Sequence, residues 1–384
     1  MNIDTWLVHP DLDRLGGHGG DPFRATVPPI YLSATYDQET PLAFGTYDYS
    51  RGANPTRDVV EHQLARLENG TRAFAFPSGV AALDGLATFL RPGDDVLASA
   101  DLYGGTFRLF TQVWGKRGIT VRYEDLTDPA RIPALLTPKT KLIHVEPLGN
   151  PMQTVCDIAA LARVARAHNL LLTVDSTSLT PLNIKPLDLG AHVVMQSATK
   201  YINGHSDVMA GVLTLRDQPL IDELAFHHNA EGVALPPFEC ALMLRGMETM
   251  SLRLERAQSN ALTIARFLAS RPDVQRVLYV GLDNHPRRDI HTAQSRGHGC
   301  VLSFTTGSVE RSARIVQRLK LFAIRVSFGS VSSSASMPAS MSHKSVPAHL
   351  RDRYAPPADL VRLSIGIEHV DDLIADLQAA FAAP

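Results

Sequence analysis

The 384-residue chain contains 45% hydrophobic and 20% charged residues, a composition typical of a globular protein with a substantial core. Its formal net charge of -2 offers no basic field to a nucleic acid, and no apolar run reaches the roughly 18 residues that span a bilayer. The scattered cysteines Cys156, Cys240 and Cys300 favour buried thiols in a reducing compartment over a metal or catalytic site. Because no secretory leader is recognisable, we expect a cytoplasmic protein.

The N-terminal region differs in texture from the rest of the chain. Its first 55 residues are rich in Gly, Pro and Thr, and Gly16 to Gly20 predicts a flexible arm, since no strand precedes it as in a dinucleotide-binding loop. From Val59 onward, apolar spacing predicts strands that alternate with helices, which indicates a mostly parallel sheet covered on both faces. The strands are expected at 96–99, 141–145, 170–174 and 192–195, and the helices at 60–68, 79–90 and 158–168.

A long helix expected over 249–269 is followed by a less regular pattern, which predicts a smaller α+β domain. Three divisions of the chain follow from this change. They are an N-terminal arm (1–55), a large domain (56–248) and a C-terminal domain (249–384). The C-terminal strands are expected at 274–279, 301–305 and 361–364, and its helices at 309–319 and 370–381.

Asp175 and Lys200 follow two consecutive predicted strands. The carboxyl ends of parallel strands open on the same edge of a sheet, where α/β proteins bind ligands. A lysine amine and a carboxylate are the pair that pyridoxal 5'-phosphate (PLP) requires, because the amine forms an imine and the carboxylate keeps the ring nitrogen protonated. The hydroxyls of Ser197 and Thr199 are placed to bind a phosphate. A lysine after a strand is usually a solvated surface residue, but the combined pattern favours a PLP site.

A second phosphate-binding element is Phe76-Pro77-Ser78-Gly79-Val80, which opens a predicted helix. Backbone N–H groups at a helix N-terminus bind anions, and Gly79 permits their close approach. The alternative is an ordinary helix start capped by Ser78. The residues alone leave both interpretations open.

Motifs along nearly the whole chain resemble, in the same order, those of the Cys/Met-metabolism (trans-sulfuration) family of PLP-dependent enzymes. The family includes cystathionine γ-synthase, cystathionine γ- and β-lyases and methionine γ-lyase. The resemblance implies the type I PLP-enzyme fold (aspartate-aminotransferase-like), with a mostly parallel central sheet and a smaller C-terminal α+β domain. The motifs are YDYSRGANPT (47–56), FPSGVAAL (76–83), DLYGGTF (101–107), VDSTSLTP (174–181), SATKYINGHSDVMAG (197–211), MLRGMETMSLRLERAQSNA (243–261) and LVRLSIGIEHVDDLIADL (360–377).

The resemblance implies a role for each residue of the cofactor site. Lys200 would carry PLP as a Schiff base, Asp175 would bind the ring nitrogen, and Tyr103 would stack on the ring and help move protons. A homo-oligomer is also implied, a tetramer built as a dimer of dimers, because Tyr49 and Arg51 would reach the phosphate in a neighbouring subunit. The full set of cofactor-binding residues would be Tyr49, Arg51, Gly79, Val80, Tyr103, Asn150, Asp175, Ser197, Thr199 and Lys200.

On the substrate side, the resemblance implies Arg362, Ser327, Ser332 and Tyr49, with Arg362 clamping the substrate carboxylate. Arg362 could instead be a solvent charge on an edge strand, but its VRLSIG motif favours the clamp. The chain departs from the family pattern at Ser332, where many members carry an acidic residue. Two further departures are Gly105, at a position that is usually cysteine in methionine γ-lyases, and HVEPLGNP (144–151) in place of E-x-P-S/T-N-P.

Two remaining segments carry weaker signals. His227-His228 has no third ligand at a plausible spacing, so we expect a solvated pair and no metal site. The serine-rich segment Ser330 to Ser342 resembles a linker, but in the family it would be a loop over the active site, with small side chains suited to a pocket wall or mobile lid.

The expected activity is γ-elimination from a γ-substituted amino acid, which gives a 2-oxo acid and ammonia. The alternatives are γ-replacement, as in a cystathionine γ-synthase, a γ-substituent linked through oxygen, and a PLP-binding protein without catalysis. The joint presence of Lys200, Asp175, Tyr103 and Arg362 argues against the last of these. Because Ser332 is uncharged, we expect a substrate with an uncharged or cationic tail and no second carboxylate, and L-cystathionine as a poor substrate.

Overall fold

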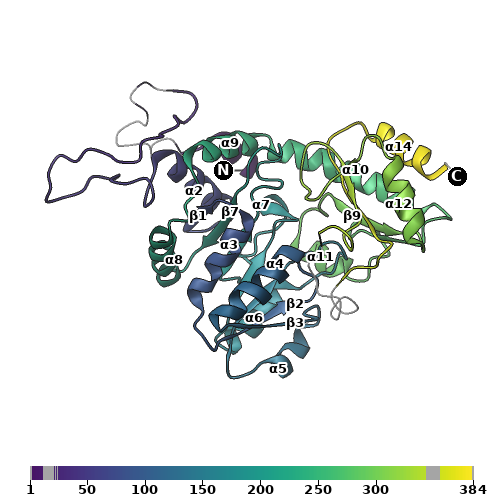
Figure 1. The fold of residues 1–384 in the computed structure, drawn as a ribbon, viewed down its shortest axis with the longest axis horizontal. Helices are drawn as coiled ribbons and strands as arrows, with labels where there is room; N and C mark the ends of the chain where they lie inside the picture. Colours follow the sequence, from purple (N-terminus) through teal and green to yellow (C-terminus); the bar gives the residue numbers. More distant parts are fainter. Residues whose placement is uncertain (1, 12–20, 22, 24, 343–354, 383–384) are drawn as a thin grey trace.

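The computed structural model describes residues 2–11, 21, 23, 25–342 and 355–382. A seven-stranded sheet, the large sheet, has the strand order β1-β7-β6-β5-β4-β2-β3 (Figure 1). Strands β3, β2, β4, β5 and β6 run parallel, and β7 runs antiparallel to both of its neighbours. The strands are β1 (Arg72–Phe76), β2 (Asp95–Ser99), β3 (Thr120–Glu124), β4 (Thr140–Val145), β5 (Leu171–Asp175), β6 (Val193–Gln196) and β7 (Gly211–Leu215).

Strand β1 shows why the large sheet is covered on both faces. Successive side chains of a strand point to opposite faces, so a buried strand needs apolar residues on both. Ala73 and Ala75 belong to one core cluster, whereas Phe74 and Phe76 belong to another. The first cluster includes residues of α2 (Pro55–Leu67) and α9 (Pro237–Glu248), and the second includes residues of α3 (Gly79–Gly85), α4 (Gly104–Arg108) and α8 (Gln218–Glu231).

The helix termini follow from local capping. The helix expected at 60–68 begins at Pro55, because the Asn54 side chain accepts hydrogen bonds from the N–H groups of Thr56 and Arg57. The helix expected at 79–90 changes after Gly85 into a 3-10 helix, whereas the expectation for 158–168 is confirmed by α6. Further helices are η2 (Leu86–Phe89), η3 (Leu109–Trp114), η4 (Gly115–Arg117), η5 (Pro129–Arg131), α5 (Ile132–Leu135), α6 (Ile158–Ala167) and α7 (Thr180–Asn183).

Helix α10 (Met250–Ala269) connects the two cores of the molecule (Figure 1). Its N-terminal half contributes Met250 and Leu254 to the core that α2 and α9 share. Its C-terminal half contributes Ile264 and Leu268 to a separate core formed with α12 (Val309–Arg318) and α14 (Val370–Ala382). A single helix therefore belongs to both cores, and the division of the chain after residue 248 remains a prediction.

The second core is built on a five-stranded sheet, the small sheet, with the order β10-β11-β12-β9-β8. The expectation of a loop over Ser330 to Ser342 is wrong in part, because β11 within it is a buried strand that pairs with β12. The small side chains of Ser334 and Ser336 fit this closely packed position. The remaining elements are β8 (Arg276–Leu278), α11 (Arg288–Gln294), β9 (Val301–Thr305), α12 (Val309–Arg318), β10 (Ala323–Ile324), β11 (Ser334–Ser336), β12 (Val361–Ser364) and α14 (Val370–Ala382).

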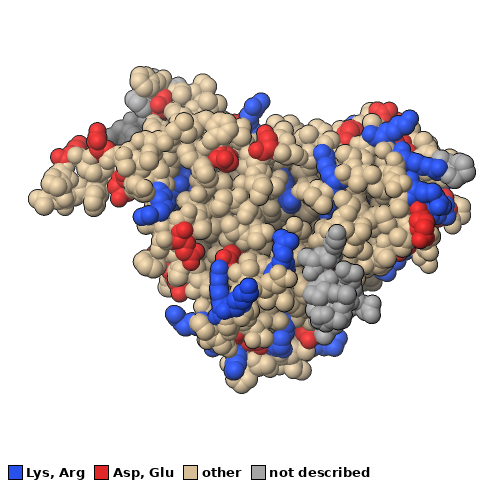
Figure 2. Space-filling view, viewed as in Figure 1, with Lys and Arg blue, Asp and Glu red and all other residues tan. Residues whose placement is uncertain are grey.

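An N-terminal arm projects from the body of the molecule, at the left of Figure 1. Helix α1 (Ile3–Val8) packs against α2 and α9, and the expected flexible stretch Gly16 to Gly20 lies outside the described residues. Residues 25–50 contain no Lys or Arg, and the arm at the left of Figure 2 shows acidic groups among mostly uncharged residues. Several large apolar side chains are exposed on it, namely Val27, Ile30, Leu32, Leu42 and Phe44.

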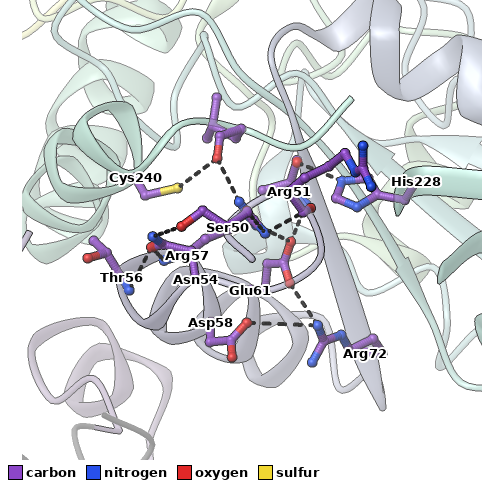
Figure 3. A network of polar contacts seen from close by, with 12 residues as sticks. Ser50, Arg51, Asn54, Thr56, Arg57, Asp58, Glu61, Arg72, His228 and Cys240 are labelled. Atoms are coloured by element: carbon purple, nitrogen blue, oxygen red, sulfur yellow. Dashed lines mark hydrogen bonds and ion pairs between the residues drawn. The ribbon is translucent and has the colours of Figure 1, made fainter. Parts of the chain in front are cut away.

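Buried polar contacts fix the base of this arm to the body (Figure 3). Arg57, on α2, donates through Nη2 to the carbonyl oxygens of Ser50 (2.9 Å) and Arg51 (3.3 Å). Glu61, one turn later, accepts from Arg72 Nη2 (3.0 Å) and from the N–H of Ala75 (2.9 Å). Burial raises the pKa of Glu61, and the two arginines oppose that rise. The arm therefore leaves the body from a rigid base.

The cysteines, the absence of a membrane-spanning run and the His227-His228 pair were predicted from the sequence outside the site. All three cysteines are free and buried. Among the helices described, none is long and apolar enough to cross a membrane. The interpretation of His227-His228 as a solvated pair is wrong for His228, which is buried with Nε2 3.0 Å from the carbonyl oxygen of Ala75 and its ring against Phe76.

Candidate active site

Lys200 lies in the turn that follows β6, at the carboxyl edge of the large sheet. Its Nζ donates to Ser327 Oγ (2.6 Å), which brings the small sheet's segment 325–330 against the large sheet. The pKa of Lys200 is lowered to about 8, chiefly by burial and then by the charge of Arg362, while Asp175 opposes the shift. A lysine of this kind is an amine that is readily deprotonated near neutral pH.

Asp175 ends β5, the parallel neighbour of β6, so the structure brings it close to Lys200. Its Oδ1 accepts hydrogen bonds from Thr177 N (3.0 Å) and Thr177 Oγ1 (2.5 Å). Burial raises the pKa of Asp175, whereas the two Thr177 bonds and the charge of Lys200 lower it. Both bonds use Oδ1, which leaves Oδ2 for a cationic partner such as a protonated ring nitrogen.

Arg362 lies on β12, an interior strand of the small sheet, and its side chain is only 2% exposed. The edge-strand alternative is therefore wrong. Its Nη2 donates to the carbonyl oxygen of Ser327 (2.7 Å) and its Nη1 to Asn150 Oδ1 (3.5 Å). Nε has no partner among the described residues, and burial lowers the pKa of the guanidinium to about 10. A buried guanidinium with an unused N–H is suited to bind an anion, such as a carboxylate.

Two of the residues expected to bind phosphate, Gly79 and Ser197, meet at the start of α3. Ser78 caps this helix through a hydrogen bond from Ala81 N to its Oγ (3.0 Å), so the capping interpretation is confirmed, and phosphate binding at the same terminus stays a prediction. A Cβ added at Gly79 would lie 2.7 Å from Ser197 Oγ, which shows how closely the helix terminus and this hydroxyl approach. Thr199 Oγ1 makes two hydrogen bonds with the backbone of Ala210. It donates to the carbonyl oxygen (3.1 Å) and accepts from the N–H (2.9 Å).

Sequence reasoning missed two buried carboxyl groups beside the expected residues. Glu146 Oε1 accepts from the N–H of Tyr103 (3.1 Å) and the carboxyl group also accepts from the backbone of Asn150. Asp101 Oδ2 accepts from Thr154 Oγ1 (2.6 Å). Burial raises the pKa of Glu146 well above its usual value, and the nearby carboxylates add to the rise. The glutamate in HVEPLGNP was the available signal, but a single acidic residue in a motif does not reveal its neighbours.

Tyr49 and Arg51 lie on the arm, and within the described chain neither contacts the Lys200 region. The Arg51 guanidinium lies over the Tyr49 ring, with its Cζ 5.3 Å from the ring centroid, and Nε donates to Asn229 Oδ1 (3.3 Å). Both side chains are exposed. This placement leaves their expected role in a neighbouring subunit as a prediction.

Ser332 is not a free hydroxyl in the site. Arg325 Nη2 donates to both Ser332 Oγ (2.6 Å) and the Ser332 carbonyl oxygen (2.7 Å). A substrate group near Ser332 would therefore also lie near the Arg325 guanidinium. The sequence did not predict this contact.

The residues present fit PLP. Lys200 supplies an amine for the aldehyde, Asp175 a carboxylate oxygen for the ring nitrogen, and α3 with Ser197 a place for the phosphate. Arg362 adds an unused N–H for the carboxylate of an amino acid. In the part of the chain that the structure describes, no group of three or more His, Cys, Asp or Glu side chains could hold a metal ion.

This fold and site define a PLP-dependent enzyme of fold type I. Residues 12–382 match the family model described as Cys/Met metabolism PLP-dependent enzyme. The chain belongs to this family, as the motifs predicted; PLP is its cofactor, and it is a carbon–sulfur lyase or a γ-synthase.

Three similar proteins illustrate the range of the family. Cystathionine beta-lyase, chloroplastic, from Arabidopsis thaliana is 46% identical over 99% of this chain and 81% of its own length. Cystathionine gamma-lyase from Dictyostelium discoideum is 41% identical over 93% of this chain and 92% of its own. The crystal structure of cystathionine gamma-lyase from Lactobacillus plantarum complexed with L-serine superposes with a TM-score of 0.95, at 37% identity, over 100% of this chain and 99% of that one.

Proposed function

We propose that this enzyme is a carbon–sulfur lyase that cleaves L-cystathionine by β-elimination to L-homocysteine, pyruvate and ammonia, with uptake of one water. The observation that supports an amino-acid lyase most strongly is that Lys200 and Arg362 both contact Ser327. Lys200 donates to its hydroxyl oxygen, and Arg362 donates to its carbonyl oxygen. The β-regiochemistry is supported by the 46% identity with the Arabidopsis cystathionine beta-lyase. It replaces γ-elimination, our prediction from the sequence, as the first candidate.

Arg362 would hold the α-carboxylate of the substrate and thereby place the α-carbon within reach of Lys200. The carboxylate can accept from the unused Nε–H, so the buried guanidinium gains the anionic partner that it lacks within the described protein. Ser327 keeps the two cations in register, because each of them contacts it. The position of the amino acid is therefore set before any bond changes.

Lys200 would take the α-proton as a general base. Its pKa of about 8 matches this role, because a base near the working pH is present in its neutral form and still binds a proton well. When bound, PLP supplies an electrophilic ring that accepts the electrons left at the α-carbon. Asp175 would keep that ring protonated, and Glu146 would hold the backbone of Tyr103 through its N–H.

γ-Elimination remains the second candidate, supported by the likeness to the Dictyostelium cystathionine gamma-lyase. The same substrate distinguishes the two reactions. β-Elimination of L-cystathionine releases pyruvate and homocysteine, whereas γ-elimination releases 2-oxobutanoate and cysteine. We expect pyruvate as the main 2-oxo acid when the products are separated by chromatography. A predominance of 2-oxobutanoate would overturn the β-assignment, and formation of cystathionine from cysteine and an O-acylhomoserine would indicate the γ-replacement alternative.

We also propose a homotetramer built from two dimers, in a cytoplasmic location. The projecting arm supports assembly, because its large apolar side chains are exposed and do not pack into a core of the described chain. Residues 25–50 of the arm contain no Lys or Arg, which also suits burial of this stretch against a second copy.

A further inference from the structure

A cleft of about 360 Å³ opens beside the reacting lysine. One wall is the large-sheet segment 206–209, and the other is the small-sheet segment 325–330. Ser327 and Thr199 also line it, so the cleft adjoins the Nζ of Lys200, which is 2.6 Å from Ser327 Oγ. A substrate whose α-carbon lies at Lys200 can extend its tail into this space.

Arg325 contributes a guanidinium to the small-sheet wall of the cleft. Its Nη2 donates to both oxygens of Ser332, and its backbone N–H donates to the carbonyl oxygen of Ala335 (3.3 Å). The side chain is therefore held in place while half-buried. Its Nε and Nη1 have no hydrogen-bond partner, and no carboxylate pairs with it, within the described residues. This leaves three N–H donors and a full positive charge for an anion.

The opposite wall carries a negative charge, Asp207. Its Oδ1 accepts from Asn203 Nδ2 (2.7 Å), and the side chain is otherwise exposed. The two walls are tied together by a hydrogen bond between Ser206 Oγ and Ser330 Oγ (3.0 Å). The cleft thus presents a cation and an anion on facing walls, which is the charge pattern that complements a zwitterion.

We propose that Arg325, positioned by Ser332, binds the distal carboxylate of the substrate, and that the preferred tail is a second amino-acid head group whose ammonium faces Asp207. This inference rests on the proposed lyase function and names its specificity residue. It reverses the expectation drawn from Ser332 alone, because the sequence does not show that a guanidinium lies against that serine. Serine at position 332 then serves a purpose: it fixes the arginine and adds no charge of its own.

The test uses three S-substituted L-cysteines that differ only in tail charge. L-Cystathionine has a carboxylate and an ammonium, S-(3-carboxypropyl)-L-cysteine has the carboxylate alone, and S-butyl-L-cysteine has neither. We expect Arg325→Met to raise KM at least tenfold for the two tails with a carboxylate, to change kcat less than threefold, and to leave kcat/KM for S-butyl-L-cysteine unchanged. Arg325→Lys should fall between, and Ser332→Ala should raise KM for L-cystathionine a few-fold, since it removes one of the two bonds that hold the guanidinium.

Arg314→Met is the matched control. It removes an exposed positive charge from helix α12, which shares a core with the small sheet, and Arg314 does not line the cleft. A readout without turnover comes from calorimetry of L-cystathionine binding to Lys200→Ala, with and without Arg325→Met, where we expect at least tenfold weaker binding in the double variant. Unchanged KM and affinity for L-cystathionine, or an equal loss with S-butyl-L-cysteine, would overturn the proposal.

The experiments distinguish an error in the proposed β-elimination from an error in the proposed role of Arg325. If wild type releases 2-oxobutanoate from L-cystathionine, the β-elimination proposal fails, but the Arg325→Met effect on L-cystathionine binding still decides the role of Arg325. If pyruvate is the product and Arg325→Met binds L-cystathionine as wild type does, only the specificity inference fails. Arg325→Lys, which keeps a cation, guards against a variant that merely misfolds.

Discussion

At the scale of single residues, the chemistry depends on charges that are buried together. Lys200 and Arg362 are cations held near one another, and the repulsion between them is one reason why the pKa of Lys200 falls to about 8. Asp175 and Glu146 are the corresponding acids, and burial raises the pKa of both; the acidic neighbours of Glu146 add to its rise, whereas Thr177 and Lys200 oppose the rise at Asp175. The two carboxyl groups therefore differ in their surroundings: Asp175 has a cation and a hydroxyl donor beside it, whereas Glu146 lies among other carboxyl groups.

Replacing Lys200 with alanine removes the amine that contacts Ser327. We expect the purified variant to lose the visible absorption of lysine-linked cofactor and its turnover to fall by several orders of magnitude. Lys141→Ala, which removes an exposed lysine from β4, is the control and should behave as wild type. A visible band in Lys200→Ala that borohydride still reduces onto the protein would show that another lysine carries the cofactor.

Asp175→Asn tests the charge at the ring nitrogen separately from the fold. The amide keeps an oxygen for the two Thr177 bonds but is neutral at the other position. We expect PLP to remain bound while kcat falls by about 10²- to 10³-fold, the range for losing a preorganised electrostatic contact. Steady-state kinetics on the cofactor-saturated variant measures this, and a kcat near that of wild type would mean that a different group partners the ring.

At the scale of elements, the contact between α3 and the Ser197 turn shapes the phosphate site. Gly79→Ala would place a Cβ 2.7 Å from Ser197 Oγ and 2.8 Å from its Cβ, so the turn has to move. We expect the dissociation constant for PLP to rise about tenfold or more, as charge-assisted contacts are lost. Gly115→Ala is the control, since a Cβ there meets nothing within 4 Å. Equal PLP affinity of the two variants would contradict this view of the site.

Glu68, at the end of α2, links this helix to β6 by accepting from Gln196 Nε2 (2.8 Å), and its other oxygen has no partner within the described chain. Burial raises its pKa from 4.5 to about 7. Between pH 4.5 and about pH 7, Glu68 releases its proton in the unfolded chain but keeps it in the folded chain. The free energy of unfolding therefore falls as pH rises through this window, by at most about 3 kcal/mol, and is level above it.

Glu68→Gln should remove that slope, because the amide resembles the protonated acid. We expect its thermal midpoint relative to wild type to increase from pH 5 to pH 7.5, measured by calorimetry in matched buffers. Glu255→Gln, an exposed residue on α10, controls for the loss of a surface carboxylate. A midpoint difference that stays constant with pH would indicate that Glu68 is ionised throughout.

At the scale of the whole molecule, the arm decides how the site is completed. Arg51 lies at the base of the arm, where Arg57 donates to its carbonyl oxygen and to that of Ser50 (Figure 3). Its guanidinium lies over the Tyr49 ring, and neither residue has a contact with Lys200 among the described residues of the chain. If they serve a neighbouring subunit, a hybrid dimer of Arg51→Ala and Lys200→Ala chains contains one intact site. Random mixing of the two inactive variants should then restore about a quarter of wild-type activity.

Mixing Lys200→Ala with Asp175→Asn is the matched control for this experiment, because both residues belong to the site of one chain and no hybrid is intact. We expect no recovery there beyond the residual activity of the two parents. Native mass spectrometry should verify hybrid formation in each mixture. Absence of recovery in verified Arg51→Ala and Lys200→Ala hybrids would show that each site is built from a single chain.

Local pattern was sufficient to predict much of the large sheet. The expected strands and the expected helices at 158–168 and 309–319 match elements of the structure within one or two residues. The pattern missed β1, β3 and β7. Strand β3 is a partly exposed edge strand without an apolar run, whereas β7 is buried along its whole length and its apolar residues were not interpreted as a strand. The pairing of Asp175 with Lys200 was predictable, since adjacent parallel strands bring their carboxyl ends to one edge.

The sequence by itself determined the fold class and the cofactor, and it predicted Lys200 as the lysine that carries PLP, because periodicity and short motifs are encoded locally in the chain. Only the tertiary structure decided what meets that lysine. Ser327 lies 127 residues from Lys200, and Arg362 lies 212 residues from Asn150, yet they form one site. Besides burial, the raised pKa of Glu146 depends in part on Asp175 and Asp101, which other segments of the chain bring beside it. Such contacts arise when the two sheets pack against each other, and no local pattern records them.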